Sequence, residues 1–122
     1  MNALVEQGAA RAIRNALVRA KQAGGKPIQG ACGVFKACGA GLGIQRGLFN
    51  SGKVCPLCAI SVVNSIPTSE PDLTGKAAEA LGVSEDWILS FFQGYDGEEL
   101  LNGEKVAYRM GRKLWGKFKP AE

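Results

Sequence analysis

Apolar residues recur at intervals of three and four along most of this chain, and that spacing predicts α-helices. The first predicted helix covers residues 3–22, with arginines on one side and small or aliphatic residues on the other. Gly24 and Gly25 follow and are expected to end it. The side expected to face the core carries Ala9, Ile13, Ala16, Leu17 and Ala20.

The remaining apolar stretches extend the same pattern. Helices are expected at 55–65, with Pro56 in the first turn, and at 104–118. The glycine-rich stretch 30–49 has helical spacing too, but its glycines require close packing to hold it. No run shows the alternation of a strand, so we predict one all-α domain over residues 1–122, a compact bundle of about six short helices.

Residues 72–94 predict two of these helices joined as a hairpin similar to a helix-turn-helix. Asp72 and Ser84 are expected to cap its helices, Gly82 is expected to make the turn, and Gly94 is expected to end the second helix. In a DNA-binding motif the second helix meets the phosphates, yet here it begins with Glu85 and Asp86. The sequence therefore favours a helical hairpin that does not read DNA.

Part of the chain resembles a loose group of small uncharacterised bacterial and phage-type proteins. The resemblance rests on "CPLCAI" at residues 55–60, on "DWILSFFQGYDG" at residues 86–97 and on "AYRMGRKL" at residues 107–114. It covers residues 55–117, and Cys58 stands where the group has glycine. The resemblance implies a helical fold with Trp87 and Phe91 in the core, and it implies no activity.

Charge is segregated along the sequence. The net charge is +4, but residues 1–58 carry eight Lys and Arg against Glu6 alone. Residues 68–104 carry nine Asp and Glu against Lys76, and residues 105–119 add six cations. This order predicts pairing between the acidic and basic segments, or a basic face for an acidic partner; we favour pairing.

The four cysteines allow three interpretations. Cys55 and Cys58 are spaced to bind one metal, and Cys32 and Cys38 would complete a four-thiolate zinc site. Buried thiols in tight helix packing are the second interpretation and the one we favour. In the third, a CxxC redox site, Cys55 is the nucleophile and Cys58 the resolving thiol.

The function predicted first is binding without catalysis. Histidine is absent, which removes Ser-His and Cys-His catalytic arrangements. Helical surfaces are expected to contact a protein partner or a second copy of the chain, with Tyr108 and Trp115 on the last helix at the interface. We expect a cytoplasmic location, no membrane association, and no cofactor beyond a zinc ion if the cysteines bind one.

The alternative function is a nucleic-acid-binding module, with or without the zinc site. Its phosphate contacts would come from the basic first and last helices. These contacts are predicted for Arg11, Arg14, Arg19, Arg109, Arg112 and Lys113. A thiol-redox protein is the third hypothesis.

Overall fold

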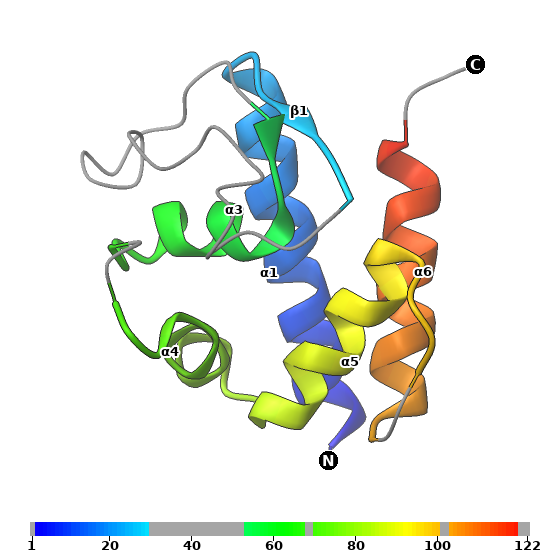
Figure 1. The fold of residues 1–122 in the computed structure, drawn as a ribbon. Helices are drawn as coiled ribbons and strands as arrows, with labels where there is room; N and C mark the ends of the chain where they lie inside the picture. Colours follow the sequence, from blue (N-terminus) through cyan, green and yellow to red (C-terminus); the bar gives the residue numbers. More distant parts are fainter. Residues whose placement is uncertain (1, 30–52, 68–69, 101–102, 120–122) are drawn as a thin grey trace.

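The fold is all-α, as predicted (Figure 1). The structure, a computed structural model, describes residues 2–29, 53–67, 70–100 and 103–119. Five helices and a pair of short strands lie within these residues, and the predicted glycine-rich helix at 30–49 falls outside them. The elements are α1 (Ala3–Gln22), β1 (Lys26–Pro27), β2 (Lys53–Val54), α3 (Pro56–Val63), α4 (Leu73–Leu81), α5 (Glu85–Asp96) and α6 (Lys105–Phe118).

The longest described helix, α1, runs through the middle of the molecule beside α3, α4 and α6 (Figure 1). All five small and aliphatic residues predicted to face the core are buried. Glu6 is buried as well, and its Oε2 accepts a hydrogen bond of 2.9 Å from the indole Nε1–H of Trp87 on α5. Neither α1 nor another described helix has both the length and the apolar character to cross a membrane.

The predicted hairpin is formed by α4 and α5. Asp72 and Ser84 accept hydrogen bonds from the first turns of these helices, and Gly82 ends α4 with a left-handed backbone, as predicted. The prediction that the second helix ends at Gly94 is wrong, because α5 continues to Asp96 and ends at Gly97, whose φ is +74°.

Gly94 lies inside α5 because α6 crosses it there. A Cβ on Gly94 would overlap the carbonyl oxygen of Tyr108, and a Cβ on Gly111 would overlap that of Phe91. Only glycine allows two helix backbones to approach so closely. The pair α5 and α6 is therefore the most closely packed contact between elements in the described part of the fold.

A short parallel pairing of β1 with β2 was missed by the sequence pattern. Lys26 pairs with Lys53 and Pro27 with Val54. Strands of two residues are too short to show alternation in a sequence. Their effect is to tie the end of α1 to the start of α3, where Pro56 occupies the predicted first turn.

Candidate functional site

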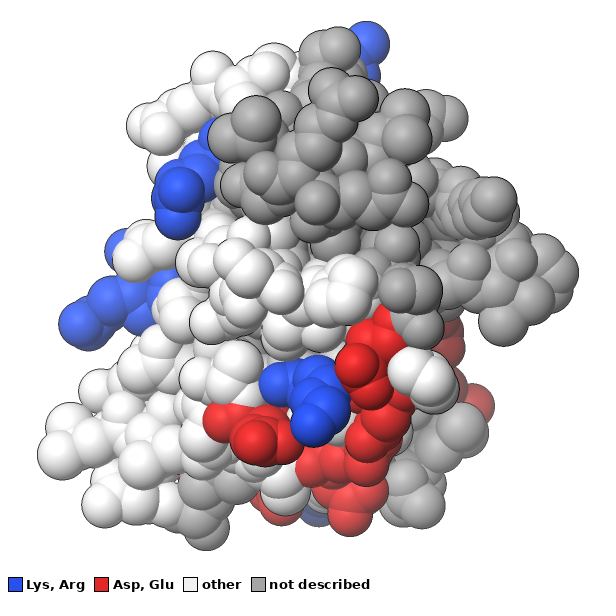
Figure 2. Space-filling model, turned by 90° about the vertical axis from the view of Figure 1, so that its left-hand side faces the viewer, with Lys and Arg blue, Asp and Glu red and all other residues white. Residues whose placement is uncertain are grey.

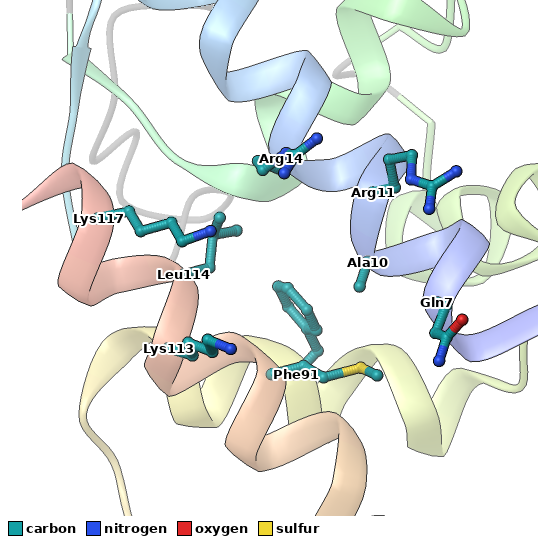
Figure 3. Close-up of a pocket in the computed structure, with 9 residues that line it drawn as sticks. Gln7, Ala10, Arg11, Arg14, Phe91, Lys113, Leu114 and Lys117 are labelled. Atoms are coloured by element: carbon teal, nitrogen blue, oxygen red, sulfur yellow. The ribbon is translucent and has the colours of Figure 1, made fainter. Parts of the chain in front are cut away.

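An open cavity of about 270 Å³ lies between α1 and α6, above α5. Figure 3 shows the ring of Phe91 pointing from α5 into the space between the two helices. We call this feature the α1–α6 groove. It is lined by Gln7, Ala10, Arg11, Arg14, Phe91, Met110, Lys113, Leu114 and Lys117.

Helical periodicity explains why these side chains share one groove. The lining positions of α1 are 7, 10, 11 and 14, and those of α6 are 110, 113, 114 and 117. Both sets follow the spacing that places residues on one face of a helix. The two helices thus turn equivalent faces toward each other, each with two cations.

The groove is strongly cationic, because two Arg and two Lys but no carboxylate are among its lining residues. Arg11, Arg14, Lys113 and Lys117 are all exposed. The ion pair found between two described residues is Lys76 with Glu79, 4.0 Å apart and both on α4. No ion pair between the described cations of α1 or α6 and the described carboxylates of the acidic segment is found, and pairing between two copies of the chain stays a prediction.

The acidic residues gather elsewhere. Figure 2 looks onto the side of the molecule where α4 lies, and it shows carboxylates clustered around a cation there. Asp72, Glu79, Glu85 and Asp86 are exposed on α4 and the first turn of α5. These four carboxylates are thus not among the residues that line the cationic groove.

The structure sorts the six cations predicted to meet phosphates into two groups. Arg11, Arg14 and Lys113 line the α1–α6 groove. The others are exposed on the same helices but do not line it: Arg19, Arg109 and Arg112.

Sequence reasoning missed the other six lining residues of the groove, among them Gln7, Phe91 and Lys117. Lys117 lies one turn after Lys113, and Gln7 one turn before Arg11, so the helical spacing contained a signal for both. Phe91 comes from a third helix, and the sequence carries no sign that it would lie beneath the cations.

The predicted interface residues Tyr108 and Trp115 are half-buried rather than freely exposed. The hydroxyl of Tyr108 donates a hydrogen bond to the backbone oxygen of Glu98. The indole of Trp115 packs edge-on against the ring of Tyr95, with centroids 5.3 Å apart. Much of each side chain is therefore used within the fold, and an interface at these residues stays a prediction.

The exposed face of α5 does not resemble a DNA reader. Glu85 and Asp86 occupy its first turn, as predicted, and both are exposed. Gln93 is half-buried, with its amide oxygen enclosed. This face offers carboxylates where phosphates would lie, whereas the α1–α6 groove offers cations.

Two of the four cysteines can be placed. Cys55 caps α3, and its sulfur accepts a hydrogen bond of 3.4 Å from the backbone N–H of Cys58. Both are buried, unlike the partly exposed thiol that a redox CxxC needs. Cys32 and Cys38 lie outside the described residues, and no cluster of metal-binding side chains is found within them, so the zinc site stays a prediction.

Tyr95 is a buried polar residue beside these thiols. Its hydroxyl finds no hydrogen-bond partner among the described residues. Burial raises the pKa of Tyr95 most strongly, and the nearby Cys55 and Asp96 raise this pKa further, because each disfavours the phenolate. The hydroxyl is therefore held in its neutral form.

No family model, curated protein or solved structure matches the chain.

Proposed function

We propose that this protein is a non-enzymatic nucleic-acid-binding module, and that the α1–α6 groove holds the phosphates. The observation that carries the proposal is the convergence of four cations from two helices on one groove without a carboxylate among its lining residues. The proposal includes a cytoplasmic location, where nucleic acid is present.

The charge arrangement supports a polyanionic partner. Neighbouring cations repel each other. A phosphate chain placed between them removes that repulsion and releases its own counterions. Arginine adds a planar donor group that binds phosphate through two hydrogen bonds. Arg11 and Arg14 line the groove from α1, and Lys113 and Lys117 line it from α6, so a phosphate chain along the groove would lie near cations of both helices (Figure 3).

A protein partner or a second copy of the chain, which the sequence favoured, has less support. The side chains expected at that interface are half-buried and packed within the fold. The acidic surface around α4 could bind the groove of another copy, so self-association belongs in the test as a competing outcome.

The test is a salt titration of binding to a labelled duplex and to a labelled single strand. Replacing Arg14 and Lys113 by Ala should weaken binding and flatten the log–log salt dependence by up to about 1.8 on duplex and about 1.4 on a single strand, as expected for two lost phosphate contacts. Arg19 and Arg112 provide the matched control, because replacing both by Ala removes the same charge from the same helices outside the groove.

Equal losses in the groove variant and the control variant would show that net charge, and not the groove, causes the binding. If binding did not depend on salt and the protein formed a dimer at the same concentration, self-association would replace nucleic-acid binding as the function.

A further inference from the structure

We infer that the α1–α6 groove selects unpaired nucleotides, taking a base into its apolar interior while the cations at its rim hold the flanking phosphates. This inference rests on the proposed function and names the class of nucleic acid. It depends on the apolar side chains that lie beneath the cations.

The interior of the groove is apolar. Ala10, Met110 and Leu114 line its two walls, and Phe91 forms its floor. The ring of Phe91 is fixed by stacking on Trp87, with centroids 5.5 Å apart, and by an edge contact with Phe92. Phe91 is only 1% exposed and Leu114 only 6%, so a nucleobase would meet mainly the half-buried side chains of Ala10 and Met110.

A site that bound phosphates alone would gain nothing from such an interior. In a duplex the bases are stacked inside and the convex backbone would contact only the rim of a concave site, leaving the apolar surface in water. An unpaired base has a free face that can be removed from water against apolar side chains regardless of sequence. The apolar interior therefore favours a single strand over a duplex.

The size of the groove agrees with one base. Sites for drug-sized ligands are about 300–1,000 Å³, and this cavity of about 270 Å³ lies just below that range. Gln7 lies at the rim with an amide that can both donate to and accept from a base edge. One nucleotide with its neighbouring phosphates fits this combination of volume and chemistry.

The experiment compares two labelled oligonucleotides of equal length and charge, one of thymidines and one of abasic sites. The abasic strand keeps every phosphate and lacks every base, so the ratio of the two dissociation constants measures base binding. The wild-type protein should bind the thymidine strand about fivefold or more tightly, from the low end of the usual contribution of one bound base.

Ala10→Leu tests the location, since Ala10 points into the groove and a leucine there would fill it without changing the charge (Figure 3). This variant should bind the two strands almost equally. Ala12→Leu is the matched control, because Ala12 is exposed on α1 outside the groove and should keep the wild-type ratio.

The outcomes separate this inference from the proposed function. Equal salt-dependent binding of both strands by the wild type, or an unchanged ratio in Ala10→Leu, would overturn the inference and leave the phosphate site standing. No binding of either strand that depends on Arg14 and Lys113 would overturn both. Displacement of the thymidine strand by a glutamate-rich peptide with one tryptophan, at a lower concentration than unlabelled thymidine strand requires, would assign the groove to an acidic protein instead.

Discussion

The two sides of α6 differ in how they meet their neighbours. Toward α5, Gly111 and Gly94 bring backbone against backbone. Toward α1, Lys113 and Lys117 line an open groove whose other side carries Arg11 and Arg14. One helix thus has a close backbone contact on its α5 side and an open groove with long charged side chains on its α1 side. We expect the first to contribute stability, and the second is the proposed binding surface.

Stability should be most sensitive to substitutions where α6 contacts α5. Gly111→Ala would place a methyl group on the carbonyl of Phe91, and backbone cannot move aside as a side chain can, so we expect a loss of about 3 kcal/mol or more in the free energy of unfolding. Chemical denaturation measures this. Gly116→Ala on the same helix meets nothing within 4 Å and should raise stability by about 0.5 kcal/mol. Similar effects of the two substitutions would contradict the close crossing.

The hydrogen bond between α1 and α5 comes next. Trp87→Phe leaves the buried Glu6 carboxylate without its indole donor, and we expect a loss of about 2 kcal/mol in the free energy of unfolding. Glu6→Gln keeps an acceptor oxygen for the same N–H and should cost clearly less. If Glu6→Gln destabilised the protein as much as Trp87→Phe, the bond would not be the reason.

Tyr95, which lies on α5 and packs against Trp115 of α6, should make stability fall at alkaline pH. Its pKa is raised in the folded state, so above its unfolded pKa of about 10 the unfolded chain loses the proton first and is stabilised relative to the folded chain. Tyr95→Phe removes a hydroxyl without a described hydrogen-bond partner, so it should change stability little at pH 7 and be about 1.4 kcal/mol more stable than wild type at pH 11. Unfolding at both pH values tests this, and parallel pH profiles would refute it.

Substitutions of cations in the α1–α6 groove should have the smallest effect on stability. Arg14→Gln with Lys113→Gln removes two cations that make no ion pair with a described carboxylate, so the free energy of unfolding should stay within about 0.5 kcal/mol of wild type or rise slightly. Thermal denaturation at low salt is the measurement. A clear loss of stability would mean that these cations are paired after all.

The elements of the fold were largely predictable because their signals are local. The buried face of α1, the caps at Asp72 and Ser84 and the turn at Gly82 depend on helical spacing and on side chains next to the backbone they bind. Gly94 misled the prediction for the opposite reason. Its role is set by Tyr108 on another helix, and a glycine inside a helix looks the same in sequence as one that ends it.

The candidate site was only half predictable. Arg11, Arg14 and Lys113 were chosen for charge and helix position, and the structure brings these three together. That Arg19 and Arg112 lie outside the groove, and that Phe91 lies at its base, depends on how α1, α5 and α6 are rotated against one another. Packing in three dimensions decides that rotation, and the spacing within one helix does not contain it.

The most direct test of the central claim is an NMR titration of the ¹⁵N-labelled protein with the thymidine strand. The account predicts that the amide shifts cluster at residues 7–14 and 110–117, which carry the groove, while the acidic α4 and the first turn of α5 stay unchanged. Shifts centred on α4 and the start of α5, or none at all in the α1–α6 groove, would contradict it.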